Sequence, residues 1–524
     1  MEFDMELLRR NKFCRGIKRG REYVCGGEAD EGTKSNAIEL LAEAVRRILK
    51  WRVWETWWVD EAMDEWLEKR DRLEVQLRGK YSEEVVNAIT GLVNEFINYN
   101  EKFLNYWQTV GGEAEKLVDD LLSSRAEVVI WSNEGGVSVH YGHVTLEAHR
   151  AGGSVTVQLV LNGLEGVTIK VPDVFVKTMS REEYERFINE VLMALRGGLE
   201  EADGFVENGY AAMETTQTWQ VVVWALLYPG ENFVYANAVN VNEGSVTITY
   251  YMVSYHKPLK GKIFGNVDKL GEEELLAFML GAVLGDGWTD VVKPVMNGRV
   301  YDEAVITITM ADERYKAWEP LFERLGKMGF RSGKPNLING NEVKVAFNGS
   351  NAIDLARAMI SILPPILRDV LDALAFEKWE RIKRIAEMEM KFRRGEMRID
   401  VGYRFSVSIL KGTIALVHRA KDEAEAEKVI EALRAVYGDE FYAYVNKSGK
   451  YLVVIIPMYV FEKYEDIKAQ VVKVLCEKLE KTKDEKKRQI IIKYLKRLTP
   501  TKGAAAVDHG LTRVVWLGTH CLAY

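Results

Sequence analysis

The spacing of hydrophobic positions changes along the chain, and each spacing indicates a different kind of structure. Between residues 36 and 122 apolar residues recur every three or four positions, and the first proline is Pro172, a pattern typical of long amphipathic helices. From Ala126 apolar residues alternate with other residues, and pairs of glycines separate the alternating runs, as expected of strands joined by turns. The pattern predicts a helical N-terminal region over residues 1–125 and a β-rich α+β domain over residues 126–256.

One later stretch is hydrophobic on every side. Each residue from Leu275 to Leu284 is apolar or glycine, which predicts a helix that is buried on more than one face. Gly281 and Gly285 lie four positions apart and therefore on one face of that helix. Because glycine destabilises a helix, this pair indicates that the backbone of another helix approaches closely. Asp286 follows the apolar run and would emerge where the helix ends, as a candidate metal ligand.

The elements predicted after this helix have a regular order. Lysines and Pro258 mark the segment before it as a linker. The helical and alternating patterns then predict helix, strand, strand, helix, strand, strand and helix over residues 268–393. The predicted strands cover 288–295, 300–310, a short stretch near Phe330 and 342–348, and the later helices cover 312–328, 350–363 and 366–393.

This segment resembles the LAGLIDADG homing endonucleases. The nine-residue signature of that family falls on residues 279–287, and the resemblance covers residues 268–393. It implies an α+β fold of αββαββα modules, in which two signature helices pack through small residues and each supplies an acid to a metal site. Here it implies helix packing through Gly281 and Gly285. It further implies Mg²⁺ held by Asp286 and by the backbone of Gly285, and hydrolysis of double-stranded DNA with Asp286 as the catalytic residue.

The same stretch is similar to the paREP proteins, a multicopy repeat family of hyperthermophilic archaea. Glu, Lys and Arg are abundant while Gln is scarce, and this bias fits a hyperthermophile. The alternative to an active enzyme is a catalytically inactive DNA- or RNA-binding relic of the fold, encoded by a mobile or repeat element.

A single aspartate rarely suffices for metal-dependent cleavage of a phosphodiester bond, so a second acid is expected. A homodimer would place Asp286 opposite its own copy, whereas a pseudo-symmetric monomer would use Glu396 or Asp203. In a monomer, the expected partner of the Gly281 face is first the helix that begins near Ile366, and next the helix that ends at Asp203.

Residues 198–204 echo the end of the signature. A second signature helix at this place would bring Arg196 and Glu200 into a close-packed seam between helices, where charge is unfavourable. The preferred interpretation is therefore an amphipathic helix over residues 180–202 that ends at Gly204.

Residues 394–500 repeat the order strand, strand, helix, and they are interpreted as a degenerate second module with a basic C-terminal helix, followed by a tail over residues 501–524.

The chain has a net charge of -7, which does not favour DNA as a partner. Basic residues nevertheless gather in residues 7–21 and 481–502, so contact with DNA must come from local patches.

Polar positions that alternate with apolar ones along the predicted strands, together with basic residues near them, are candidate contacts to DNA. An ordinary sheet with one solvated face explains the alternation equally well. The candidate nucleic-acid contacts are Lys293, Arg299, Thr307, Thr309, Lys344, Asn348, Arg404, Lys486, Lys487 and Arg488.

The apolar runs are far shorter than the roughly 20 residues that span a bilayer, and the acidic N-terminus lacks the apolar core of a signal peptide. Four scattered cysteines are too few to predict a disulfide framework. We therefore expect a cytoplasmic protein without a membrane segment.

Overall fold

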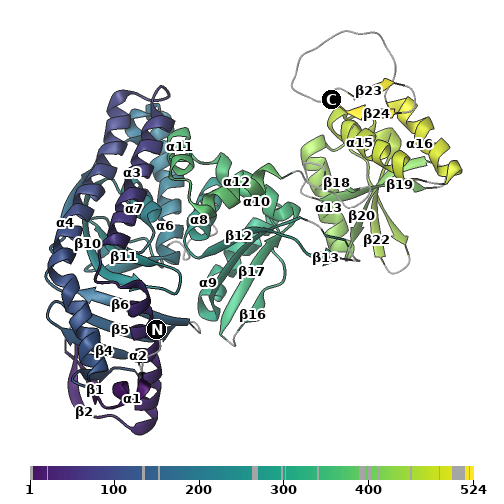
Figure 1. Ribbon diagram of the computed structural model, residues 1–524. Coiled ribbons are helices and arrows are strands. Elements are labelled where there is room, and N and C mark those ends of the chain that lie inside the picture. The colour runs from purple at the N-terminus through teal and green to yellow at the C-terminus, as the bar shows by residue number, and fades with distance from the viewer. Residues whose placement is uncertain are drawn as a thin grey trace. The chain divides into compact units, whose positions relative to one another are not determined.

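The computed structural model of the chain has an α+β fold and divides into two compact units (Figure 1). Unit 1 comprises Met1–Leu321, Ser332–Asn348 and Ala352–Glu387, and unit 2 comprises Phe322–Arg331, Gly349–Asn351 and Met388–Tyr524. The structure describes residues 4–19, 22–132, 136–151, 154–262, 269–296, 299–300, 302–338, 341–388, 396–398, 403–410, 413–448, 451–482, 484–498, 514–517 and 520–523.

Long helices dominate the N-terminal part of unit 1, namely α1 (Met5–Arg9), α2 (Glu31–Trp51), α3 (Trp57–Leu77) and α4 (Glu83–Leu122). Their apolar stripes face a sheet. Trp66 of α3 donates a hydrogen bond to the hydroxyl of Tyr250 (3.2 Å), and that hydroxyl donates to Asn100 of α4 (2.6 Å). Although α4 spans 40 residues, neither it nor another helix in the described part of the chain is long and apolar enough to cross a membrane.

The sheet that these helices cover contains 11 strands in the order β2-β1-β3-β4-β5-β6-β10-β11-β9-β8, with β7 paired to β10. Its strands are β1 (Lys12–Arg19), β2 (Glu22–Glu28), β3 (Glu127–Ile130), β4 (Val137–Tyr141), β5 (Val144–Ala151), β6 (Ser154–Leu161), β7 (Val167–Val171), β8 (Gly204–Glu207), β9 (Tyr210–Thr215), β10 (Gly230–Val241) and β11 (Val246–Ser254). Strand β1 lies parallel to β3. The N-terminal region, which was predicted to be helical, therefore adds a hairpin to the sheet of the β-rich region.

A disulfide joins Cys14 and Cys25, whose Cα atoms are 5.5 Å apart. The scattered cysteines do not predict it, because the pairing depends on the β1–β2 hairpin, in which Gly16 lies opposite Cys25. This hairpin was not expected within a helical region.

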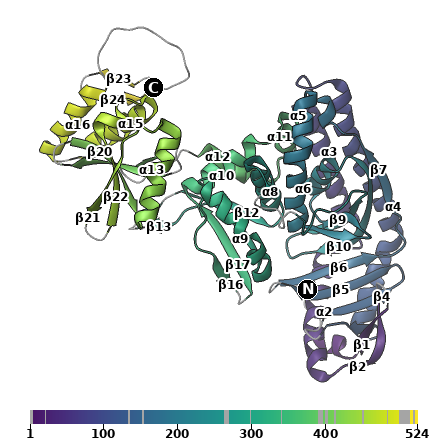
Figure 2. The same cartoon turned by 180° about the vertical axis from the view of Figure 1, so that it is seen from behind.

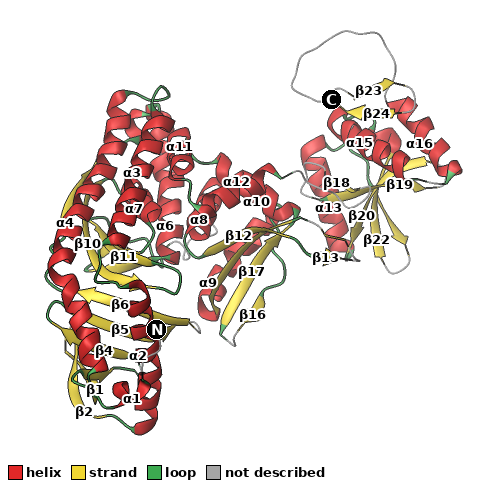
Figure 3. Ribbon diagram, viewed as in Figure 1, coloured by secondary structure: helices red, strands yellow, loops and turns green. Residues whose placement is uncertain are grey.

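Two copies of one arrangement follow along the chain, and they belong to unit 1 except for Phe322–Lys327, the end of one helix, which groups with unit 2. The first copy consists of α6 (Met193–Ala202), β8, β9, α7 (Thr218–Leu227), β10 and β11, and the second consists of α8 (Glu272–Leu284), β12 (Gly287–Val292), β15 (Glu303–Ala311), α9 (Asp312–Lys327), β16 (Asn336–Ile338) and β17 (Glu342–Asn348). In each copy the strands lie in the order first, second, fourth, third. Figures 1 and 2 show α6 and α8 side by side from opposite directions, and Figure 3 separates the helices from the strands of each copy. We call these copies module 1 and module 2.

The helix predicted over residues 366–393 is broken in the structure. After α10 (Ser350–Ser361), the chain forms α11 (Pro365–Leu374) and α12 (Glu377–Glu387). Ala375 between the two has a left-handed backbone with φ of 46°, a conformation that ends a helix. The side chain of the next residue, Phe376, stacks on Trp219 of α7 with ring centroids 3.8 Å apart.

Unit 2 contains a sheet in the order β18-β19-β20-β22-β21 and a separate β23–β24 pair. Without the edge strand β18, the order is again first, second, fourth, third. The elements are β18 (Glu396–Arg398), β19 (Arg404–Leu410), β20 (Thr413–Ala420), α13 (Glu423–Tyr437), β21 (Tyr444–Ser448), β22 (Tyr451–Pro457), α14 (Met458–Phe461), α15 (Glu465–Lys481), α16 (Glu485–Leu498), β23 (Val514–Leu517) and β24 (His520–Ala523). The region interpreted as a degenerate second module thus carries the same strand order, but it follows two earlier copies.

Candidate active site

Helices α6 and α8 are in contact through their backbones. A Cβ atom placed on Gly281 would lie 2.8 Å from the backbone nitrogen of Leu199, and one placed on Gly198 would lie 2.9 Å from the backbone nitrogen of Ala282. Both distances are shorter than real Cβ atoms show, so a larger side chain would push the helices apart. The prediction that Gly281 packs on another helix of the chain identifies the right face of α8.

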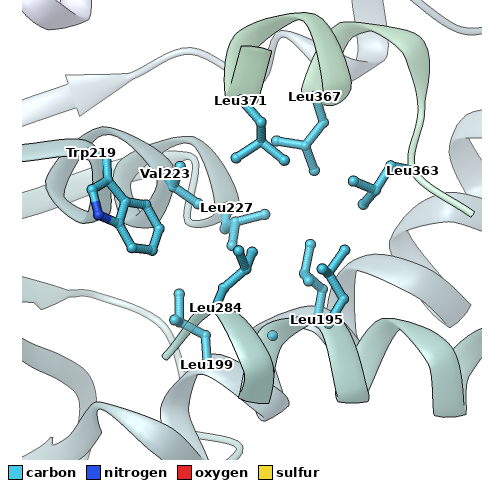
Figure 4. A pocket seen from close by; sticks show the side chains of 11 residues that line it. Leu195, Leu199, Trp219, Val223, Leu227, Leu284, Leu363, Leu367 and Leu371 are labelled. Carbon is cyan, nitrogen blue, oxygen red and sulfur yellow. The ribbon is translucent and has the colours of Figure 1, made fainter. Parts of the chain in front are cut away.

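The predicted order of partner helices is wrong. The helix that contacts Gly281 is α6, which ends next to Asp203, and not the helix that begins near Ile366. The leucines of α11 lie beside the pair, where they line a small apolar cavity together with residues of α6, α7 and α8 (Figure 4). They are thus neighbours of the seam but do not form it.

The charges that argued against a second signature helix lie away from the seam. The guanidinium of Arg196 lies over the ring of Tyr228, at 4.7 Å from its centroid. The carboxylate of Glu200 accepts hydrogen bonds from the Tyr228 hydroxyl and from the backbone nitrogens of Leu259 (2.7 Å) and Lys260 (3.0 Å). Because both buried charges have partners on the far side of α6, they leave the glycine face free of charge, and the amphipathic-helix interpretation is corrected.

Two aspartates follow the ends of the paired helices. Asp203 follows α6 directly, and Asp286 follows α8 after Gly285. A Cβ atom on Gly285 would lie 3.1 Å from a carboxylate oxygen of Asp203, so the carboxylate of Asp203 lies against the end of the other helix. Burial raises the pKa of Asp203, and the charge of Asp286 raises it further. The charge of Asp286 therefore acts on the carboxyl group of Asp203 across the helix pair.

Amide and basic side chains surround the two acids. Gln220 donates a hydrogen bond to Asp203 (2.5 Å), and Arg314 donates one to Asp286 (3.1 Å). Burial also raises the pKa of Asp286, whereas Arg314 and Lys378 lower it. Both acids thus have partners that favour the charged form.

Lys378, in the first turn of α12, binds the end of α8. Its ammonium group donates hydrogen bonds to the carbonyl oxygens of Leu284 (2.9 Å) and Gly285. Burial lowers the pKa of this lysine, while Asp203 and Asp286 raise it. The ammonium of Lys260 similarly donates to the carbonyl oxygen of Gly204, beyond the end of α6. Each helix end therefore carries one acid and one lysine.

Of the predicted metal ligands, Asp286 is free of contact with a lysine ammonium group in the hydrogen bonds described above, whereas the carbonyl oxygen of Gly285 is not. The oxygens of two carboxylates suit Mg²⁺, and Asp203 lies where a second acid was needed, whereas Glu396 belongs to unit 2. The carbonyl oxygen of Gly285, a predicted ligand, accepts the hydrogen bond from Lys378, so an ion at that oxygen would have to displace the ammonium group.

The structure separates the predicted nucleic-acid contacts. Thr309 and Lys344 are paired across β15 and β17, and the ammonium of Lys344 lies 5.8 Å from the ring of Trp288, which is 42% exposed. Thr307 is only 2% exposed, so it cannot reach DNA in this conformation, and this assignment is corrected. Asn348 and Lys293 are exposed.

The remaining candidates are divided differently. The side chain of Arg299 lies outside the described residues. Unit 2 holds Arg404 together with Lys486, Lys487 and Arg488 of α16. The guanidinium of Arg488 donates to the carbonyl oxygen of Leu479 (2.7 Å), so it stabilises the connection between α15 and α16 instead of lying free for a phosphate.

Sequence reasoning missed Lys260, Lys378, Gln220 and Trp288. A lysine or glutamine outside a motif cannot be identified as a site residue from a single sequence. Lys378 enters the site because the predicted helix is broken at Ala375. A signal for Asp203 did exist, since it follows a glycine-containing helix as Asp286 does.

Comparisons with protein-family models and with curated protein sequences find no match. Solved structures do match in part. A crystal structure of the LAGLIDADG homing endonuclease I-GzeII in complex with its DNA target is 12% identical, with 41% of this chain and 94% of that chain covered and a TM-score of 0.12. A point mutant of I-SmaMI is 10% identical, with 41% and 93% covered and a TM-score of 0.13. These identities and TM-scores are too low to assign a function to this chain.

Replacing Gly281 or Gly198 with Leu should lower the free energy of unfolding by about 1–3 kcal/mol, because either side chain forces the two helix backbones apart. Chemical denaturation measures this change. Gly112 is the matched control, since it lies inside α4 with open space around it. Gly112→Leu should leave stability unchanged or raise it by up to about 1 kcal/mol. Equal effects at all three positions would show that the seam is not specifically packed.

Proposed function

We propose that the protein is a metal-dependent endonuclease of double-stranded DNA with Asp203 and Asp286 in its catalytic centre. One observation carries the proposal: two carboxyl groups far apart in sequence are brought to the ends of two helices whose backbones touch. A buried pair of acids is unfavourable to folding, because burial raises the pKa of both carboxyl groups. Strained or electrostatically unfavourable groups of this kind cluster at functional sites.

Asp203 and Asp286 would hold a hard divalent cation such as Mg²⁺. Such an ion, when bound, supplies Lewis acidity toward the phosphate and activation of a water molecule. The lysines Lys260 and Lys378 are held at the ends of α6 and α8 by backbone carbonyls. Their positive charge would stabilise the phosphate as the water oxygen bonds to phosphorus and the bond to the sugar oxygen breaks.

The DNA in this proposal lies along the outward face of module 2, where Trp288, Thr309 and Lys344 lie on neighbouring strands. Both helices of the centre belong to the same chain, so the proposed enzyme acts as a pseudo-symmetric monomer and needs no second copy.

A second candidate function is binding without cleavage. It is favoured by one observation: Arg314 and Lys378 already supply two positive charges beside the two acids, so the site can be electrically balanced without a metal ion. This function predicts salt-dependent binding of DNA or RNA and no strand breaks with Mg²⁺, Mn²⁺ or Ca²⁺.

Asp203→Asn and Asp286→Asn should each abolish cleavage of a DNA library in Mg²⁺, because each removes one of the two metal-binding charges, while DNA binding persists. Gel analysis of the products measures cleavage, and fluorescence anisotropy measures binding. Neither substitution should lower the free energy of unfolding, because each removes a charge that burial opposes. Asp312→Asn is the control, since Asp312 pairs with Lys316 on the surface and should not affect cleavage. Full cleavage by either variant of the pair would contradict the proposed centre.

Cleavage should also depend on pH. Burial raises the pKa of both acids above the ordinary value of an aspartate, and a metal ion binds their charged forms. Activity should therefore be present above these raised pKa values and be lost as the pH falls through them, at a higher pH than for a solvated aspartate. Lys378→Met removes a positive charge that lowers both pKa values, so the acid limb of the pH profile should move to higher pH. A shift to lower pH, or no shift, would show that Lys378 does not act on the acids.

A further inference from the structure

Unit 2 differs in charge from the rest of the chain. Residues 388–524, the largest segment of unit 2, contain 26 lysines and arginines against 18 aspartates and glutamates, a net charge of +8, although the whole chain has a net charge of -7. The rest of the chain must therefore carry -15. A basic unit within an acidic protein indicates an anionic partner for that unit.

The sheet of unit 2 has one face covered by helices. Residues of β19, β20 and β22 form the main core with α13, α15 and α16. On the opposite face, Ala415, Val453 and Ile455 form a separate small cluster with Val417, and all four belong to β20 and β22. In the described part of the chain, this second cluster thus contains no helix residue.

Exposed tyrosines lie at the β21 side of the sheet. Tyr444 is 39% exposed and Tyr459 is 55% exposed. The ring of Tyr442 lies near that of Tyr459, with centroids 6.3 Å apart and planes inclined by 22°. Tyr444 and Tyr459 line a cavity of about 520 Å³, and Asn446 and Arg497 are among its other lining residues. The cavity therefore combines aromatic faces, a hydrogen-bonding amide and a positive charge.

We propose that this cavity binds single-stranded nucleic acid, with unpaired bases stacking on Tyr444 and Tyr459. Exposed aromatic side chains stack on bases of any type, and basic groups nearby pair with the phosphates. In double-stranded DNA the faces of the bases are stacked on one another, so exposed tyrosines cannot stack on them. Arg497, whose side chain is 57% exposed, donates two hydrogen bonds to the carboxylate of Glu462 (3.1 and 2.8 Å). It is the phosphate-binding residue of the proposal, and a phosphate would have to share this guanidinium with Glu462 or displace the carboxylate from it. The inference rests on unit 2 alone and not on the acids of α6 and α8.

A second aromatic cleft in the protein supplies the comparison. On the outward face of module 1, Tyr210 and Tyr255 are 39% and 47% exposed, and their rings are 5.3 Å apart. They line a cleft of about 450 Å³ with Glu207, and no lysine or arginine is among its lining residues. Tyrosines with the same exposure thus lie beside a carboxylate, which disfavours phosphates.

The test measures binding of the full chain to labelled oligonucleotides of about 20 nucleotides, a length that exceeds typical single-strand sites, in EDTA so that no cleavage occurs. Single-stranded DNA and single-stranded RNA are compared with a duplex of the same sequence. The single strands should bind more tightly than the duplex, and the DNA and RNA arms identify the preferred sugar. Tyr444→Ala and Tyr459→Ala should each weaken single-strand binding about tenfold, through the loss of one stacked base, whereas Tyr444→Phe should retain it.

Further variants test whether the effect is specific to this cavity. Tyr210→Ala and Tyr255→Ala should leave the affinity unchanged, and Arg497→Gln should make the dependence on salt less steep by about 0.7 for one phosphate. Asp203→Asn should bind single strands as the natural protein does, so failure of the proposed nuclease would leave this result intact. Tighter binding of the duplex, no binding of single strands, or equal affinity in the folded Tyr444→Ala and Tyr459→Ala proteins would overturn the inference.

Discussion

The contact between the backbones of α6 and α8 is the constraint on which the site depends. Gly198 and Gly281 lie where any side chain would meet a backbone atom of the other helix. Because the helices approach this closely, the residues that follow them, Asp203 and Asp286, come together. They do so although burial favours the neutral form of both carboxyl groups. Glycine lowers helix stability, so the close contact between the two helices is made at the expense of local helix stability.

Much of this arrangement could be predicted from the apolar pattern. A helix that is hydrophobic on all sides must be buried, and two glycines on one face require a close neighbour. These features identify α8, its packing face and the acid at its end. Alternating positions also predict three of the four strands of the sheet that follows α8, because hydrophobic periodicity is a local property of the sequence. The remaining strand was expected near Phe330, and the structure forms it later, as β16 (Asn336–Ile338).

The partner helix could not be chosen reliably, because the choice depends on where charges point in the folded chain. Arg196 and Glu200 appear unfavourable in a packed seam, but their partners, Tyr228 and the backbone at Leu259 and Lys260, lie on the other side of α6. Lys378 reaches the site only because Ala375 has a left-handed backbone conformation that ends α11, so that α12 begins as a separate helix. The place of the β1–β2 hairpin in the large sheet was missed for a related reason, since the pairing of β1 with β3 is a contact between distant residues.

The same strand order occurs three times along the chain, twice in modules 1 and 2 and once in unit 2. Modules 1 and 2 meet through their first helices and form a paired-acid site. Unit 2 repeats only their strand order, and it carries an excess of positive charge and exposed tyrosines beside a cavity. Chemistry and recognition of an anionic strand would then be assigned to different parts of one chain. The opposite net charges of the two regions fit this division.

The central claim is that Asp203 and Asp286 act as one metal site. Calorimetric titration with Ca²⁺ on the natural protein, on Asp203→Asn, on Asp286→Asn and on the double variant measures whether the two acids are coupled. A shared site predicts that either single substitution removes most of the affinity and that the second adds little. Independent, additive losses, or unchanged affinity in both single variants, would contradict the account.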